Sequence, residues 1–100
     1  MNYLKDTHYM GAIVGRVANR IDGAQAIIGE LTYTFDNNEY SKQTLHGGTQ
    51  SCAFQKWRVY SVSDSSATFI LDEPDGHMGF PGNFRFKVRY EIKKPMKLEI

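Results

Sequence analysis

The sequence predicts an all-β protein, an antiparallel β-sandwich or part of one. Several short segments alternate apolar and polar residues with the period of two that a half-buried strand requires. Turn-forming residues separate these segments at short intervals. No segment keeps the 3.6-residue apolar period of an amphipathic helix. With 100 residues and 41% hydrophobic residues, the chain makes at most one small domain with a modest core.

The first half of the chain predicts a short strand followed by a hairpin. The apolar run Gly11–Gly15 is bounded by glycines, which is consistent with a buried strand. A turn is expected at Asp22-Gly23. Residues 24–28 and 31–35 then flank Gly29-Glu30, and glycine at the first loop position favours a type II′ hairpin. The second arm of this hairpin alternates like a half-buried strand.

The second half predicts a second hairpin and a long strand. Residues 57–62 and 67–71 flank a short polar turn. Residues 84–93 alternate most clearly, with large apolar residues on one face and charged residues on the other. Residues 96–100 begin another strand that stops in mid-alternation at Ile100. Because an unfinished strand leaves an edge in want of a partner, we expect either a homo-oligomer through exposed strand edges or a piece of something larger.

Composition and charge exclude several classes of function. The net charge is +1 with both signs interspersed, so neither a nucleic-acid-binding patch nor a cationic membrane-surface helix is predicted. Cys52 is the only cysteine, which rules out an intrachain disulfide and favours a reducing compartment. The first residues do not have the pattern of a signal peptide. No apolar run approaches the roughly 20 residues of a spanning helix. We therefore expect a cytoplasmic protein.

Two polar clusters frame the first hairpin and are the candidate site. Asn19 and Arg20 follow Gly15, and an amide beside a guanidinium suits vicinal hydroxyls or a ring oxygen. The alternative is an arginine paired with a carboxylate at a strand end. His46 lies between Leu45 and two glycines that would leave its ring open to a ligand. The alternative for His46 is a structural histidine bonded to a backbone carbonyl. We interpret these groups as part of a sugar site.

Other reactive side chains predict ordinary roles. His8, His46 and His77 form no metal-ligand spacing, so no metal site is predicted. Cys52 lies six residues after His46 with no orienting third group, and a small buried thiol is the expected role. The acidic stretch 72–76 lacks the alternating ligands of a calcium loop and is read as a turn.

Taken in order, these segments resemble the aldose 1-epimerases, or galactose mutarotases. The resemblance covers nearly the whole chain, and it implies that residues 1–100 are an N-terminal part of that domain, truncated at both ends relative to the family and a fragment of its β-supersandwich. The segments that carry the resemblance are Gly11–Ile21, the hairpin with Gly29 and Tyr33, Leu45–Gly48, Phe54 with Trp57, Asp75-Gly76 and Gly79–Asn83.

The resemblance implies an isomerase of hexose and galactose metabolism that uses no cofactor. Such enzymes interconvert the α and β anomers of galactose, glucose and related aldoses. A general base takes the proton of the anomeric hydroxyl while a general acid protonates the ring oxygen. The ring opens, the C1–C2 bond rotates, and the ring closes on the other face.

By the same resemblance, Asn19, Arg20 and His46 bind the substrate, and His46 has an auxiliary catalytic role in polarising the ring oxygen together with Arg20. The general-acid histidine, the general-base glutamate and a sugar-binding aspartate of the family have no counterpart in this sequence. We therefore expect part of a sugar site that is inactive alone. The rival hypotheses are a non-catalytic carbohydrate-binding module and a self-associating structural β-domain.

Overall fold

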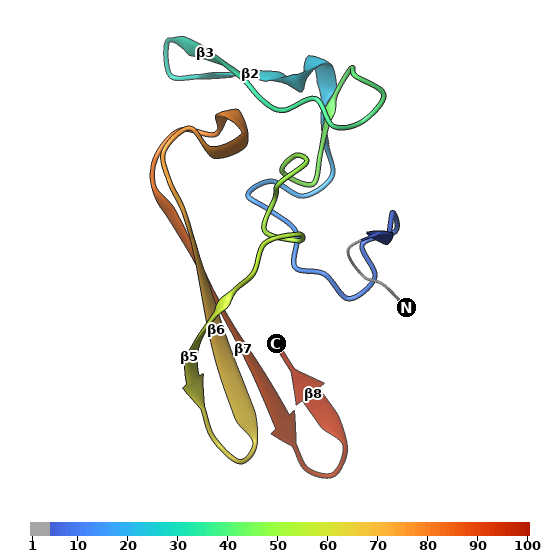
Figure 1. The fold of residues 1–100 in the computed structure, drawn as a ribbon, viewed down its shortest axis with the longest axis vertical. Coiled ribbons are helices and arrows are strands. Elements are labelled where there is room, and N and C mark those ends of the chain that lie inside the picture. Colours follow the sequence, from blue (N-terminus) through green and yellow to red (C-terminus); the bar gives the residue numbers. More distant parts are fainter. Residues whose placement is uncertain (1–4) are drawn as a thin grey trace.

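The computed structural model describes residues 5–100, and the strands in this part form three antiparallel sheets (Figure 1). Two sheets are pairs, β1 with β4 and β2 with β3, and the third has the order β5-β6-β7-β8. The predicted all-β, antiparallel class is confirmed. The strands are β1 (Arg20–Ile21), β2 (Gln25–Ile28), β3 (Leu31–Thr34), β4 (Thr44–Leu45), β5 (Arg58–Val62), β6 (Ser66–Glu73), β7 (Phe84–Lys93) and β8 (Lys97–Glu99), and the short 3₁₀ turns are η2 (Asp22–Ala24) and η3 (His77–Gly79).

The four-stranded sheet has one apolar and one charged face, as the alternation of residues 84–93 predicts. Directly opposed residues of antiparallel strands share a face. Phe69 lies opposite Val88, and Leu71 lies opposite Phe86. On the other face, Asp72 lies opposite Arg85, and the Nε atom of Arg85 is paired with the Asp72 carboxylate. The predicted second hairpin is present as β5 and β6.

The first hairpin forms as predicted and docks against the loop between β6 and β7. Gly29 has φ 65°, as the first loop position of a type II′ turn requires. After β3, the ring of Phe35 stacks on that of Phe80 with centroids 4.4 Å apart. A Cβ on Gly79 would lie 2.1 Å from the carbonyl oxygen of Thr34, so only glycine permits this approach. Figure 1 shows the loop that carries η3 beside the hairpin.

The strand predicted at Gly11–Gly15 is absent, because this segment packs against its neighbours rather than pairing with them. Its residues have no strand assignment. A Cβ on Gly15 would lie 2.8 Å from the ring of Phe86. The carbonyl oxygen of Ile13 accepts a hydrogen bond from Sγ of Cys52 at 3.3 Å. The apolar character of this run therefore reflects contact with the sheet and with the loop after β4.

The described chain is extended, so its apolar face is only partly covered. The radius of gyration is 15.6 Å, whereas a compact domain of this length has about 13 Å. The far end of the sheet leaves apolar side chains largely exposed, among them Val62 at 70% and Ile92 at 69%. The buried apolar residues are Ala24, Phe35, Cys52, Ile70, Leu71 and Phe80. In the described part of the chain, no helix is long and apolar enough to cross a membrane.

Candidate functional site

The pairing of β1 with β4 brings the two predicted polar clusters together. Asn19 and His46, 27 residues apart in sequence, form a reciprocal pair of hydrogen bonds. The backbone N–H of Asn19 donates to Nδ1 of His46 at 2.9 Å, and the backbone N–H of His46 donates to the carbonyl oxygen of Asn19 at 3.0 Å. Arg20 follows, directly opposite Leu45. Asn19, Arg20 and His46 therefore lie on one surface, and their role in binding stays a prediction.

The bond from Asn19 fixes the tautomer of the His46 ring. A backbone N–H can only donate, so Nδ1 must be the accepting nitrogen and the neutral ring carries its proton on Nε2. His46 thus presents an N–H donor at Nε2. This differs from the predicted alternative of a histidine bonded to a backbone carbonyl. The ring of Tyr9 packs against the imidazole in an edge arrangement with centroids 4.7 Å apart.

The backbone around this pair is held in an unusual conformation. Asn19 has φ 66° and His46 has φ 49°, both in the left-handed region that side-chain-bearing residues adopt rarely. Gly47 follows with φ 88°, and a Cβ there would lie 1.7 Å from the carbonyl oxygen of Gly15. Gly47 and Gly48 are buried. Gly47 thus permits the close approach of the Gly15 backbone, and Gly48 lies against Asp36. That these glycines leave the His46 ring open to a ligand stays a prediction.

Arg20 forms a two-point ion pair with Glu39. Its Nε donates to Oε2 of Glu39 at 2.6 Å, and its Nη2 donates to Oε1 at 2.7 Å. Hydrogen bonding and charge from Arg20 hold the pKa of Glu39 below its ordinary value, and Glu39 raises the pKa of Arg20. Nη1 of Arg20 bonds Oδ1 of Asn19 at 3.3 Å. The alternative of an arginine paired with a carboxylate is thus present within the candidate site.

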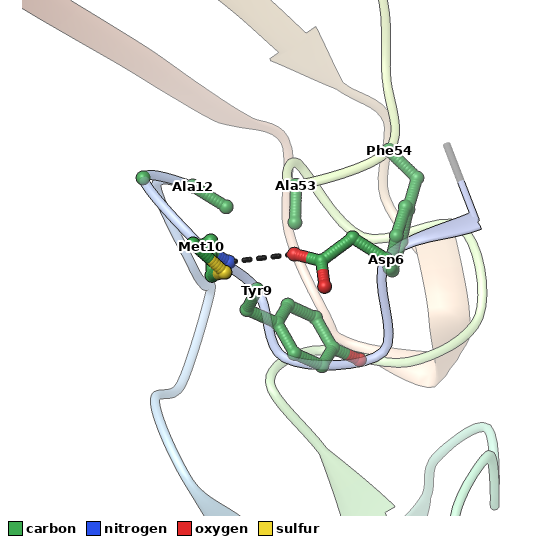
Figure 2. A pocket seen from close by; sticks show the side chains of 7 residues that line it. Asp6, Tyr9, Met10, Ala12, Ala53 and Phe54 are labelled. Atoms are coloured by element: carbon green, nitrogen blue, oxygen red, sulfur yellow. Dashed lines mark hydrogen bonds between the residues drawn. The ribbon is translucent and has the colours of Figure 1, made fainter. Parts of the chain in front are cut away.

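Sequence reasoning missed Tyr9, which contacts the His46 ring and lines two hollows. One hollow of about 430 Å³ is lined by Tyr9, Ala53 and Phe54, among others (Figure 2). The other, of about 400 Å³, is lined by Tyr9, Glu39, Leu45 and Phe54, among others. Burial, aided by the charge of Glu39, raises the pKa of the Tyr9 hydroxyl. No pattern in the first ten residues distinguishes this tyrosine as a site residue.

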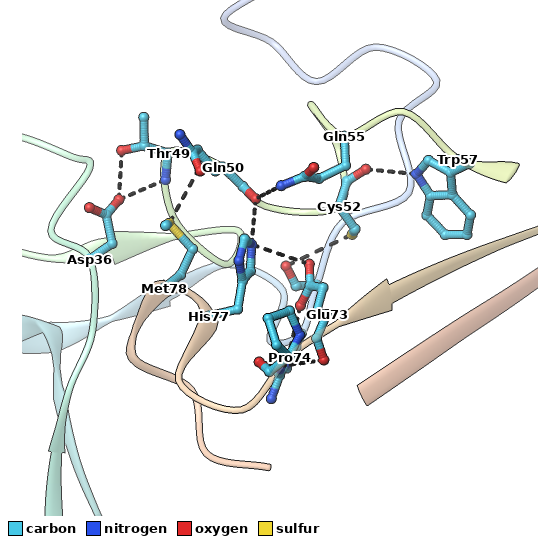
Figure 3. A network of polar contacts seen from close by, with 12 residues as sticks. Asp36, Thr49, Gln50, Cys52, Gln55, Trp57, Glu73, Pro74, His77 and Met78 are labelled. Carbon is cyan, nitrogen blue, oxygen red and sulfur yellow. Dashed lines mark hydrogen bonds and ion pairs between the residues drawn. The ribbon is translucent and has the colours of Figure 1, made fainter. Parts of the chain in front are cut away.

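The loop after His46 is tied to η3 by polar contacts (Figure 3). The carbonyl oxygen of Gln50 accepts from Nε2 of His77 at 2.7 Å and from Nε2 of Gln55 at 2.8 Å. Oδ2 of Asp36 accepts from the backbone N–H of Thr49 at 2.7 Å and from its hydroxyl at 2.6 Å. These contacts fix the path of the backbone that follows His46.

The segment before Asn19 is anchored by Arg16. Nε of Arg16 lies 3.0 Å from Oε2 of Glu73, in a pair whose side chains are 7% and 3% exposed. The remaining guanidinium nitrogens donate to backbone carbonyl oxygens, including those of Pro74 at 3.0 Å and Gly82 at 2.8 Å. Arg16 thereby holds the approach to β1 against the ends of β6 and β7. The sequence offers no signal that separates this arginine from an exposed one.

Cys52 is the small buried thiol that the sequence predicts. It is 1% exposed, and burial raises its pKa to about 12, with the charge of Glu73 contributing. A thiol with this pKa is a poor nucleophile near neutral pH. Among residues 5–100, no group of three or more histidine, cysteine, aspartate or glutamate side chains is arranged to hold a metal ion.

Comparisons with known proteins show the family to which the chain is related. The sequence model of the aldose 1-epimerase family matches residues 1–100. A probable aldose 1-epimerase of Arthroderma benhamiae is 39% identical over 105 residues, which cover 94% of this chain and 24% of that protein. The aldose 1-epimerase of Escherichia coli is 31% identical over 98 residues, which cover 98% of this chain and 28% of that protein.

The fold agrees as well. The crystal structure of an aldose epimerase homologue from C. elegans superimposes with a TM-score of 0.84 at 29% identity, covering 92% of this chain and 28% of that one. The chain thus spans about a quarter of the length of the relatives it matches. Because the family model matches residues 1–100 and the fold is shared, the chain belongs to the aldose 1-epimerase family.

Proposed function

We propose that this chain contributes one side of a pyranose-binding site that serves the interconversion of α and β anomers of aldoses such as galactose and glucose. The observation that carries the proposal is the reciprocal hydrogen bonding of Asn19 and His46. It joins two distant segments and places an amide, a guanidinium and an imidazole on one surface. Membership of the aldose 1-epimerase family supports the substrate class.

The proposed chemistry follows from the donors that remain at this surface. Nε2 of His46 carries a proton that the bond to Asn19 does not use. Nη1 of Arg20 bonds Oδ1 of Asn19 through one N–H and keeps a second N–H on the side away from Glu39. Both are donors for a ring or hydroxyl oxygen. As negative charge shifts toward the ring oxygen during ring opening, a fixed donor beside it lowers the barrier. His46 thus has an auxiliary catalytic role, while the acid–base pair implied by the family resemblance comes from other segments.

Binding of D-galactose to the 100-residue chain, followed by two-dimensional NMR, tests the proposal. We expect saturable shifts of Asn19, Arg20 and His46 with a dissociation constant in the millimolar range. Arg20→Ala should abolish them, because it removes the guanidinium donor. Arg58→Ala is the matched control, since Arg58 is an exposed arginine on β5. Loss of the shifts in both variants, or shifts confined to other residues, contradicts the proposal.

Polarimetry separates binding from catalysis. We propose that the 100-residue chain does not accelerate mutarotation of α-D-glucose above the spontaneous rate, because the acid–base pair that the family resemblance implies has no match in its sequence. Loss of a general acid or base costs about 10²–10⁴-fold in rate. Acceleration that His46→Gln abolishes would assign the chemistry to residues within this chain instead.

We further propose that the chain self-associates through its exposed strand edges. β5 and β8 are the outer strands of the four-stranded sheet, and apolar side chains such as Val62 and Leu98 are exposed beside them. Burying each such side chain is worth about 1.5–3 kcal/mol. Light scattering across a range of concentrations should therefore give a discrete oligomer. A monomer at all concentrations rejects this proposal.

A cytoplasmic location is also proposed. Its support is the single cysteine, which is buried as a free thiol, because proteins of oxidising compartments more often use cysteines in disulfides. Fractionation of cells that make the protein would test it.

A further inference from the structure

The guanidinium of Arg20 offers a ligand only part of its donor set. A planar carboxylate or phosphate binds arginine most strongly by accepting two parallel N–H bonds from one edge of the fork. The Nε–Nη2 edge of Arg20 already makes such a contact with both carboxylate oxygens of Glu39, at 2.6 and 2.7 Å. The Arg20 side chain is 51% exposed and so is open to a ligand, whereas that of Glu39 is 12% exposed.

Glu39 is itself held in place within its loop. The backbone N–H of Glu39 donates to the carbonyl oxygen of Gln43 at 3.1 Å, and the backbone N–H of Gln43 donates back at 3.2 Å. The side-chain amide of Gln43 also donates to Oε2 of Glu39. The carboxylate therefore has a fixed position from which to orient Arg20. The low pKa of Glu39 means that it is ionised throughout the neutral range.

We propose that Glu39 is a specificity-determining and positioning residue, which turns Nη1 of Arg20 toward the ligand and excludes anionic sugars from the site. The inference rests on the proposed function and adds the class of aldose that the site accepts. Sugars without charge bind, whereas sugar acids and sugar phosphates do not.

Glu39 cancels the charge of Arg20 and occupies the Nε–Nη2 edge, one of the two edges through which a guanidinium can bind an anion with two N–H bonds. A hydroxyl or ring oxygen needs only one N–H donor, and the N–H of Nη1 that does not bond Asn19 supplies it. A sugar carboxylate would meet a neutral ion pair instead of a free cation, with a fixed negative charge beside it. Specificity of this kind comes from a repulsive element as much as from attraction. Removing the charge of Glu39 should therefore open the site to anions.

The main test compares D-galacturonate with D-galactose as NMR titrants of the 100-residue chain. In the wild type, titrations followed by the resonances of Arg20 should show that galacturonate binds no more tightly than galactose. Glu39→Gln should tighten the binding of galacturonate over that of the wild type by up to about fivefold, the upper end of the range for an exposed ion pair. Glu30→Gln is the matched control, because it removes the same charge at the loop between β2 and β3. Glu39→Asp keeps the charge and should resemble the wild type.

A second readout does not depend on any sugar. The Arg20 Nε–H proton should exchange slowly with water in the wild type and faster in Gln43→Ala, which loosens Glu39 without removing its charge. Failure of galactose to bind the wild type would count against the proposed function alone, because the effect of Glu39→Gln on the affinity for galacturonate is measured separately. The inference is overturned if Glu39→Gln and Glu30→Gln give the same galacturonate affinity, or if the Arg20 Nε–H exchanges freely in the wild type.

Discussion

Arg16 and Glu73 form a buried ion pair, with Nε of Arg16 3.0 Å from Oε2 of Glu73 and both side chains more than nine-tenths buried. This pair connects the segment that carries Asn19 to the end of β6, 57 residues later. Oε1 of Glu73 has no hydrogen-bond partner and lies 3.7 Å from Nε2 of His77. The carboxylate therefore depends on Arg16 for its only direct charge-paired hydrogen bond among the described residues.

Replacing Arg16 by methionine should destabilise the chain strongly. Removing one partner of a buried pair leaves an uncompensated charge, which costs about 3–5 kcal/mol. Arg58→Met is the matched control, because Arg58 pairs with Asp72 at the surface, where its side chain is 65% exposed. That control should change the free energy of unfolding by less than about 1 kcal/mol. Urea unfolding followed by Trp57 fluorescence measures both, and equal midpoints for the two variants would refute the expectation.

Gly47→Ala should disrupt the candidate site through a backbone clash. The new Cβ would lie 1.7 Å from the carbonyl oxygen of Gly15, so the chain must shift there. Gly29→Ala separates the clash from conformational strain, because Gly29 also has a positive φ but has open space around its Cβ position. Strain alone costs about 1–2 kcal/mol. Thermal unfolding should show the larger loss for Gly47→Ala, and the His46 resonances should move only in that variant.

Cys52 should react with Ellman's reagent only when the chain unfolds. Its pKa is raised from 9.0 to about 12, which lowers the thiolate fraction at pH 8 by about 10³-fold relative to a free thiol. The pKa of Cys52 is higher in the folded chain than in the unfolded one. Ionisation of the thiol therefore does not weaken the folded state below about pH 9, and the free energy of unfolding falls as the pH rises from there toward 12. Reaction at pH 8 in urea is the control, and rapid reaction without urea would contradict the burial.

Sequence patterns predicted the strands well where alternation is strict. Residues 84–93 form a strand whose faces are those expected, because a two-residue period leaves only one way to bury the apolar side. The same reasoning failed at Gly11–Gly15. That run is apolar because Gly15 packs against Phe86 and Gly47, and such contacts across the fold leave no local period in the sequence.

Sequence patterns named the residues of the candidate site but not the residues that hold them in place. Asn19, Arg20 and His46 are expected from their residue types and from the family resemblance. Glu39 lies in a polar loop where any of several side chains could reach Arg20, and Tyr9 lies in a segment without a pattern. Which of them contacts the site depends on the pairing of β1 with β4. Contacts between residues far apart in sequence, set by that pairing, are what sequence reasoning could not supply.

The tautomer of His46 gives a direct test of the geometry. With Nδ1 accepting from the backbone N–H of Asn19 at 2.9 Å, the neutral ring must carry its proton on Nε2. Long-range ¹⁵N correlation spectra above pH 8 should show Nδ1 as an unprotonated nitrogen and Nε2 as a protonated one. His8 is the internal control, because its Nδ1 lies 3.4 Å from Oδ1 of Asp6, which can only accept, and so should not show the unprotonated shift expected for Nδ1 of His46. A protonated Nδ1 on His46 would mean that the bond to Asn19 does not form, and the donor assigned to the sugar would be lost with it.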